Sequence, residues 1–173
     1  MITVCFHGAE STGKSVLAAR LNRELGIRWV PEYGRTYCEE RGTSLTMGDL
    51  LAIAEGEQRA IEAASAGDPA LLILDTDQLM TAAWAEMLFG EIPPALLAYP
   101  KADLYLLFDA DVPWVEDGTR FFGEADSRRR FADLSEQVLV RTGVRFERIG
   151  GTWDERAEAV RAILVGLRHG ARH

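Results

Sequence analysis

Short apolar runs alternate with longer amphipathic stretches along the 173-residue chain. Three of the runs are uninterrupted, which is typical of parallel strands that are covered on both faces. Two shorter runs bring the expected strands to five: Ile2–Phe6, Ile27–Val30, Leu71–Leu74, Leu104–Phe108 and Val144–Ile149. The intervening stretches predict helices at Ser15–Leu25, Gly34–Glu40, Met47–Ala66, Thr81–Leu88, Ser127–Arg141 and Trp153–Leu167. This alternation predicts a single α/β domain over residues 1–173, with a doubly wound, five-stranded parallel sheet and flanking helices.

Two of the predicted helices begin with a capping signal, in which a threonine is followed three residues later by an acid. These pairs are Thr46 with Asp49 and Thr152 with Glu155. At the end of the chain we expect Gly166–His173 to fray, so its histidines are interpreted as solvated residues and not as metal ligands.

Residues 8–15 read GAESTGKS and match the phosphate-loop pattern G-x-x-x-x-G-K-[ST]. The match lies between a predicted strand and a predicted helix, so we set aside the alternative of an ordinary glycine turn. Glycines let successive backbone N–H groups surround a phosphate, and the helix N-terminus adds its positive dipole end. We expect Lys14 to reach the β- and γ-phosphates of ATP and the Ser15 hydroxyl to bind Mg²⁺. The predicted nucleotide-binding residues are Gly8, Ala9, Glu10, Ser11, Thr12, Gly13, Lys14, Ser15 and Val16.

Acidic residues follow two of the predicted strands, at the sheet edge where open α/β folds bind ligands. Asp75 comes directly after a strand, a position where phosphate-loop enzymes hold Mg²⁺. Alternatively, Asp75 and Asp77 only cap the helix that follows, and Asp77 could do both. Glu32 is the first candidate for the general base that accepts the proton of a substrate hydroxyl, and Asp75 is the second. Glu32 could instead serve only as an ion-pair partner of Arg35.

A segment at about residues 111–130 is rich in glycine and charge, as expected of a lid that closes over phosphates and excludes water. Arginines in a lid neutralise charge on the transferred phosphoryl group. Three consecutive arginines begin at Arg128, and because helical neighbours point about 100° apart, at most one or two can serve. Arg120 and Arg128 are the predicted catalytic arginines.

Composition limits the classes of partner. A net charge of −8 argues against a broad nucleic-acid surface, which needs a basic field. No run of apolar residues is long enough for a membrane span, and the chain begins directly on a strand, so we expect a cytoplasmic protein without a membrane partner. Cys5 and Cys38 lack metal-type spacing and are interpreted as reduced thiols. The pattern leaves the oligomeric state open.

Five motifs together resemble the ribosylnicotinamide kinase domain of NadR proteins over nearly the whole chain: GAESTGKS (8–15), PEYGRTY (31–37), LDTD (74–77), PWVEDGTRFFG (113–123) and SRRRF (127–131). The resemblance implies a P-loop kinase with a lid that transfers the γ-phosphate of ATP to the 5′-hydroxyl of nicotinamide riboside, giving nicotinamide mononucleotide in NAD salvage. It places residues 8–15 at ATP, Glu32 and Arg35 on the substrate side, Asp75 and Asp77 in the DTD motif, and Trp114–Arg120 in the lid. Val16 and Thr36 depart from the residues expected in that family.

The suggested substrate carries a cationic ring, which aromatic faces and carboxylates favour. Tyr33, Trp84 and Trp114 are candidate faces, although Trp84 is better interpreted as core. The candidate carboxylates are Glu32, Asp77 and Asp117, and the predicted substrate-binding residues are Glu32, Tyr33, Arg35, Asp77, Trp114 and Asp117. Two alternatives stay open: a kinase for another nucleoside, nucleotide or vitamin, and a nucleotide-binding regulatory ATPase module.

Overall fold

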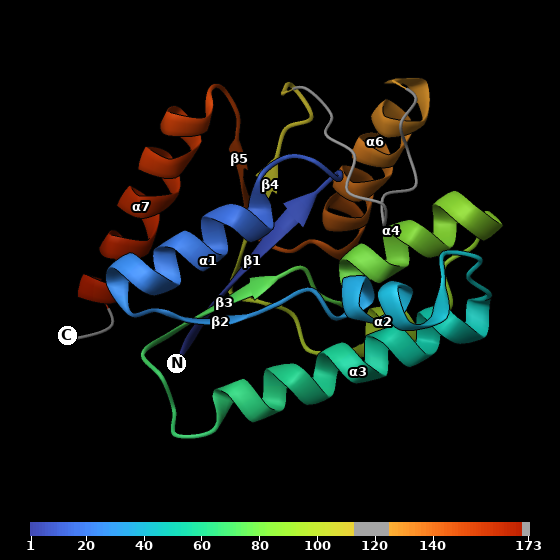
Figure 1. The fold of residues 1–173 in the computed structure, drawn as a ribbon, viewed down its shortest axis with the longest axis horizontal. Coiled ribbons are helices and arrows are strands. Elements are labelled where there is room, and N and C mark those ends of the chain that lie inside the picture. Colours follow the sequence, from blue (N-terminus) through green and yellow to red (C-terminus); the bar gives the residue numbers. More distant parts are fainter. Residues whose placement is uncertain (113–124, 171–173) are drawn as a thin grey trace.

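Five parallel strands form one central sheet in the computed structural model, which describes residues 1–112 and 125–170 (Figure 1). The strands are β1 (Ile2–Gly8), β2 (Arg28–Val30), β3 (Leu71–Asp75), β4 (Leu104–Phe108) and β5 (Phe146–Ile149). Their order in the sheet is β2-β3-β1-β4-β5, and every neighbouring pair is parallel. The predicted fold class is confirmed.

Helices cover both faces of the sheet, as Figure 1 shows. They are α1 (Lys14–Leu25), α2 (Tyr33–Arg41), α3 (Met47–Ser65), α4 (Gln78–Phe89), α5 (Pro94–Ala98), α6 (Ala125–Thr142) and α7 (Trp153–Gly170). Helices α1 and α7 pack on one face, where Val4 and Phe6 of β1 point. Helices α3, α4, α5 and α6 pack on the other face, to which Cys5 of the same strand points. Because successive side chains of β1 point to opposite faces of the sheet, this strand contributes residues to two separate hydrophobic cores.

The strand register places the carboxyl ends of β1, β3 and β4 next to one another, where the phosphate loop follows β1. Phe6 pairs with Asp75 at the end of β3, and Gly8 pairs with Phe108 at the end of β4. Gly8 has a φ of +124°, and a Cβ there would lie 2.5 Å from the carbonyl oxygen of Phe108. Because only glycine permits this approach, β1 can turn into the phosphate loop without separating from β4.

Both predicted capping boxes are present. Asp49 accepts a hydrogen bond from the backbone N–H of Thr46, and Thr46 accepts one from that of Asp49. Thr152 and Glu155 form the same reciprocal pair at the start of α7. The sequence patterns therefore located these two helix starts correctly.

Two helix boundaries differ from prediction by three residues, and one helix was not predicted. Helix α4 begins at Gln78, three residues before the predicted Thr81, because Asp77 acts as its N-cap. The five-residue α5 was not predicted, since one turn begun by a proline carries no hydrophobic period. Helix α7 continues to Gly170, so the expected fraying from Gly166 is wrong for 166–170. Among the described helices, none combines the length and apolar character that crossing a membrane requires.

Candidate functional site

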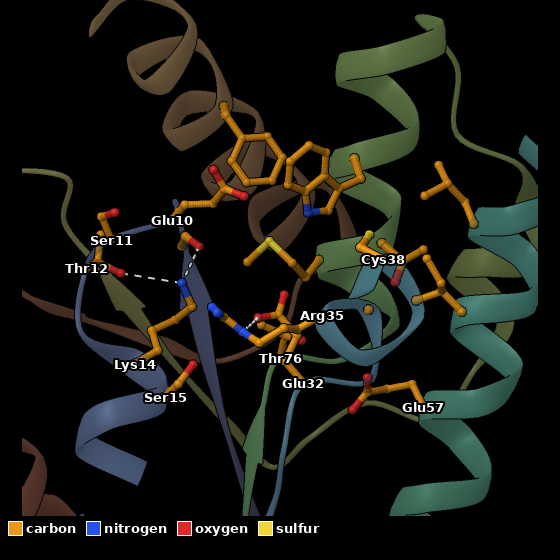
Figure 2. A pocket seen from close by; sticks show the side chains of 18 of the residues that line it. Glu10, Ser11, Thr12, Lys14, Ser15, Glu32, Arg35, Cys38, Glu57 and Thr76 are labelled. Atoms are coloured by element: carbon orange, nitrogen blue, oxygen red, sulfur yellow. Dashed lines mark hydrogen bonds and ion pairs between the residues drawn. The ribbon is translucent and has the colours of Figure 1, made fainter. Parts of the chain in front are cut away.

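A pocket of about 420 Å³ lies at the carboxyl ends of β1, β2 and β3, between the phosphate loop and helices α2, α3, α4 and α6 (Figure 2). Eight of the nine predicted nucleotide-binding residues line it; the exception is Ala9, whose side chain is buried in the core. The other residues in its wall are Glu32, Gly34, Arg35, Cys38, Leu45, Leu50, Ile53, Glu57, Thr76, Met80, Thr81, Trp84 and Phe131. One cavity thus joins the predicted phosphate end to the predicted acceptor end.

The phosphate loop encloses its own lysine. The Lys14 ammonium donates hydrogen bonds to the carbonyl oxygens of Gly8 and Ala9, at 2.9 and 2.7 Å, and to the Thr12 hydroxyl at 3.4 Å. Burial lowers the pKa of Lys14, while the carboxylates of Glu32 and Asp75 oppose this shift. Gly13, with a φ of +86°, ends the loop where α1 begins. The loop therefore presents a cation and a helix N-terminus to the pocket, which together favour a bound phosphate.

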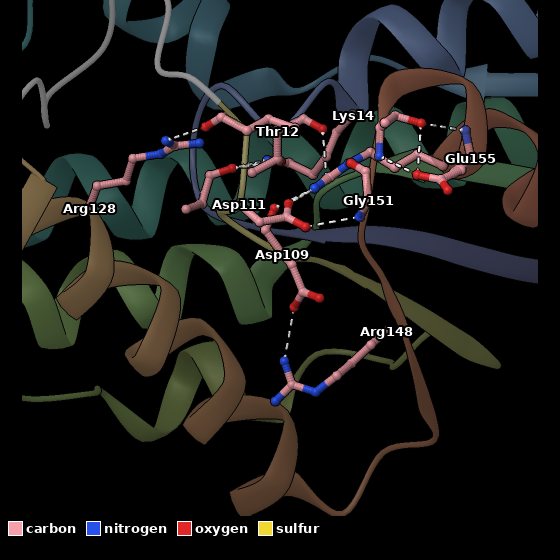
Figure 3. A network of polar contacts seen from close by, with 12 residues as sticks. Thr12, Lys14, Asp109, Asp111, Arg128, Arg148, Gly151 and Glu155 are labelled. Carbon is pink, nitrogen blue, oxygen red and sulfur yellow. Dashed lines mark hydrogen bonds and ion pairs between the residues drawn. The ribbon is translucent and has the colours of Figure 1, made fainter.

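A network of polar contacts that includes Thr12, Asp111 and Gly151 lies at the back of this loop (Figure 3), and a buried arginine, Arg156, joins its parts. The Arg156 side chain is 1% exposed, and it donates to the carbonyl oxygens of Thr12, Gly151 and Asp109 at 3.4, 2.8 and 3.1 Å. It also forms an ion pair with Asp111. Arg156 thus connects the phosphate loop to the segments that follow β4 and β5. Sequence reasoning missed it, because its partners lie 5 to 144 positions away in the chain.

Glu32 faces the loop from the end of β2. Its Oε2 atom lies 4.0 Å from Nε of Arg35, so the ion pair expected as an alternative role is present at long range. Burial raises the pKa of Glu32 to about 7, with Asp75 adding to the shift and Lys14 opposing it. A carboxylate with such a pKa exchanges protons readily at neutral pH, as a general base must.

Asp75 and Ser15, the two predicted Mg²⁺ ligands, are in contact. The Ser15 hydroxyl hydrogen-bonds the Asp75 carboxylate, whose pKa is nevertheless raised because burial dominates. Asp75 is 1% exposed, and its Oδ1 atom has no hydrogen-bond partner in the described part of the chain. Mg²⁺ takes oxygen ligands and usually binds through one or two protein groups plus phosphates and waters. A hydroxyl beside an unsatisfied carboxylate oxygen fits that preference.

Thr76, between the two aspartates, adopts a strained backbone conformation and lines the pocket. Its φ is +77°, in the left-handed region that β-branched residues avoid. Its backbone N–H donates to the carbonyl oxygen of Phe6 at 3.1 Å, which ties the strained residue to β1. Strain of this kind persists where the surrounding structure enforces it, most often at functional sites.

Glu57 of α3 lines the same pocket and was not predicted. It is 2% exposed, and its Oε2 accepts a hydrogen bond from the backbone N–H of Tyr33 at 3.0 Å. Burial raises its pKa to about 9. A signal was present in the sequence, because Leu50, Ile53, Ala54 and Glu57 share one helix face, and an acid on an apolar face marks an exception.

The aromatic wall of the pocket consists of Trp84 and Phe131. Their ring centroids are 4.5 Å apart with an interplanar angle of 43°. Trp84, interpreted from the sequence as core, in fact reaches the pocket while also packing against the core. Tyr33, predicted to bind substrate, does not line this pocket, because its ring packs against α3 at Gly56.

Asp77 caps helix α4, and its predicted substrate-binding role stays a prediction. It is 2% exposed and does not line the pocket that holds the phosphate loop. Its carboxylate accepts hydrogen bonds from the Leu79 backbone N–H at 2.9 Å and from the Tyr105 hydroxyl at 2.5 Å. The capping role that the sequence offered as an alternative is therefore the observed one.

The predicted lid arginines and their neighbours have different outcomes. Arg128 is buried in α6, and its Nη1 donates to the Val112 carbonyl oxygen at 2.7 Å. It is not among the residues that line the pocket, so its predicted catalytic role stays a prediction. The other residues predicted there, Trp114, Asp117 and Arg120, lie outside the described residues.

Comparison with known proteins identifies the family. A family model described as an AAA domain matches residues 3–156. The chain belongs to this AAA domain family. Two curated relatives of this AAA domain are trifunctional NAD biosynthesis/regulator proteins NadR, each 30% identical: that of Escherichia coli K12 over 85% of this chain and that of Salmonella typhimurium LT2 over 83%. The chain spans only 38% and 37% of their lengths. The resemblance inferred from the motifs is confirmed.

Solved structures agree on the fold of the AAA domain. A NadR protein in complex with NR has a TM-score of 0.79 at 24% identity, over 94% of this chain and 50% of that one. The thymidylate kinase of Ehrlichia chaffeensis has a TM-score of 0.66 at 13% identity, over 94% and 98% of the two chains. At these identities the likeness shows a shared P-loop kinase fold.

Proposed function

We propose that this protein is an ATP-dependent kinase that phosphorylates the ribose 5′-hydroxyl of nicotinamide riboside to give nicotinamide mononucleotide. The observation that carries the proposal is Glu32, a partly buried carboxylate with a pKa of about 7 that shares one pocket with Lys14 of the phosphate loop. A phosphate loop alone serves many reactions. A titrating carboxylate opposite the loop is what transfer to a hydroxyl requires.

Relatives support the choice of nucleotide and acceptor. The NadR structure with the highest similarity above holds NR, and a second NadR structure, with a TM-score of 0.68, holds NAD and AMP-PNP. The pocket chemistry agrees with these ligands. The Trp84 and Phe131 rings offer a face to a cationic pyridinium ring, and the Glu10 and Glu32 carboxyl groups line the same pocket.

In the proposed reaction the acceptor lies with its 5′-hydroxyl between Glu32 and the phosphate loop. Glu32 takes the hydroxyl proton while the oxygen attacks the γ-phosphorus, and the bond to the bridging oxygen of ADP breaks. Lys14 offsets charge on the phosphates once it leaves its present carbonyl partners. Mg²⁺ held by Ser15 and Asp75 would neutralise phosphate charge as well. Most of the catalysis is positioning and electrostatic stabilisation.

The test is product formation from Mg-ATP and a panel of acceptors, followed by mass spectrometry. The panel contains nicotinamide riboside, nicotinic acid riboside, common nucleosides and thiamine. We expect nicotinamide mononucleotide and ADP in equal amounts from the wild type and neither from Lys14→Ala. Lys101→Ala is the matched control, because Lys101 is the other lysine of the chain and bonds the carbonyl oxygens of Leu97 and Tyr99.

Each other outcome points to a different function. If the phosphoryl group is transferred to another compound of the panel, the acceptor assignment is wrong, but the protein is still a kinase. Slow release of ADP with every acceptor, and no phosphorylated product, contradicts the kinase and favours a regulatory ATPase module.

A further inference from the structure

Glu57 has one carboxyl oxygen that the described residues leave unsatisfied. Oε2 accepts from the Tyr33 backbone N–H, whereas Oε1 is buried and has no hydrogen-bond partner in residues 1–112 or 125–170. The side chain nonetheless lines the pocket, as Figure 2 shows. A buried polar atom without a partner costs free energy, so an apolar residue here would favour folding. A ligand that supplies the partner explains why an acid occupies this position.

The position of Glu57 limits which part of a ligand it can meet. Among the charged groups that shift the pKa of Glu57, Glu32 has the largest effect. Glu32 lies at the acceptor end of the pocket, opposite the phosphate loop. The Tyr33 N–H that holds Glu57 is adjacent to Glu32 in the chain. Glu57 is therefore on the same side of the pocket as Glu32, where the proposed acceptor binds.

Sugar hydroxyls match the chemistry of this group. Burial keeps the Glu57 carboxyl protonated at neutral pH, so Oε1 can both donate and accept a hydrogen bond. A hydroxyl can do the same, which makes the pair compatible in either direction. An aromatic ring or an aliphatic group would leave Oε1 unsatisfied.

We propose that Glu57 is a specificity-determining residue that hydrogen-bonds a hydroxyl of the acceptor's ribose 2′,3′-diol and so selects ribonucleosides. The proposal rests on the proposed kinase function and deepens it. An acceptor that lacks the contacted hydroxyl leaves Oε1 unpaired, and such a loss reduces kcat/KM by about 10- to 100-fold.

The experiment measures kcat/KM for nicotinamide riboside and for its 2′-deoxy and 3′-deoxy analogues. We expect the wild type to prefer the riboside over at least one analogue by about 10-fold or more. In Glu57→Ala that preference should fall to within about 2-fold. Glu57→Gln should keep most of it, because its amide oxygen can accept from Tyr33 and its amide nitrogen can donate to the sugar.

Glu55→Ala is the matched control, since Glu55 is an exposed acid on the same helix that pairs with Arg59. It should keep the wild-type preference. The proposal is overturned if the wild type uses all three acceptors equally well. It is also overturned if Glu57→Ala slows all three by one common factor, because a purely structural role leaves the ratio unchanged.

Failure of the kinase proposal gives a different result. If the wild type phosphorylates another nucleoside and ignores nicotinamide riboside, the acceptor assignment fails, and the same ratio measured on that nucleoside and its deoxy forms still decides the role of Glu57. If it phosphorylates no nucleoside, both proposals are overturned.

Discussion

The two ends of the pocket treat buried polar groups in opposite ways. At the phosphate end, Lys14 and Arg156 satisfy their donors with backbone carbonyls of the loop and its neighbours. At the acceptor end, Glu57 keeps a buried oxygen without a hydrogen-bond partner in the described part of the chain, and Asp75 beside Ser15, where the two ends meet, does the same. The first end therefore holds its shape before ATP binds, whereas the second keeps a polar atom that a bound ligand can pair with.

This difference separates stability from function. Groups that have internal partners hold the loop in shape before any nucleotide arrives, which lowers the cost of binding. The buried carboxyls of Glu57 and Asp75 instead have raised pKa values, so they weaken the folded state at neutral pH. We expect ligands to stabilise the acceptor end far more than the phosphate loop.

The largest expected effect is at the phosphate end. Lys14→Ala should reduce kcat by at least about 10³-fold, since it removes the cation that faces the transferred phosphate. Its midpoint of thermal unfolding should stay close to that of Lys101→Ala. Turnover at the wild-type rate would remove the assignment of residues 8–15 as the ATP site.

The next effect is a gain of stability at the acceptor end. Glu57 has a pKa of about 9 in the fold against 4.5 in a model peptide, so the folded state binds more protons between these values and stability falls as pH rises. At pH 7 this costs up to about 3 kcal/mol, and Glu57→Gln should recover much of it. Urea unfolding at pH 7 and pH 5 measures the difference, which should shrink at the lower pH. An equal change at both values would contradict the burial argument.

Glu32→Gln should lower kcat by about 10²-fold, because it removes the general base. In the wild type, kcat/KM should rise with pH and level off above about pH 7, as the carboxylate loses its proton. The variant should lose this step in its pH profile. Should Glu32→Gln remain active while Asp75→Asn is inactive, the base is Asp75.

The smallest expected effect tests the arginine behind the loop. Arg156→Lys keeps the charge but cannot bond three carbonyl groups in the same plane, so the loop should lose its fixed shape. We expect KM for ATP to rise about 10-fold with kcat and KM for the acceptor nearly unchanged. Arg148→Lys, at a half-exposed arginine that pairs with Asp109 and Glu136, is the control. A change of kcat alone would argue against a positioning role.

Local patterns predicted the parts of the molecule that local physics determines. The phosphate loop, the five strands and the two capping boxes depend on residues within a few positions of one another. For Asp77 the two interpretations were capping of the next helix and a role in the site. The capping interaction, which is local, is observed. These parts could be predicted because the sequence itself places the interacting groups side by side.

The remaining parts of the site depend on contacts between distant segments. Trp84 and Phe131 meet only because α4 and α6 pack on the same face of the sheet. Arg156 reaches Thr12 across 144 positions. Periodicity places Glu57 on the buried face of α3 but does not reveal that this face borders a pocket. Burial and pKa follow from such packing, so the sequence alone could not predict them.

Gly56 offers a route to new acceptors by laboratory evolution. A Cβ at this position would lie 2.1 Å from the Tyr33 ring, so any larger residue must displace the ring of the residue whose backbone N–H holds Glu57. Substrate range could therefore be altered from behind the pocket, without changing a residue that touches the sugar. Libraries that seek new acceptors should include Gly56 together with Tyr33, and those that seek only stability should leave both unchanged.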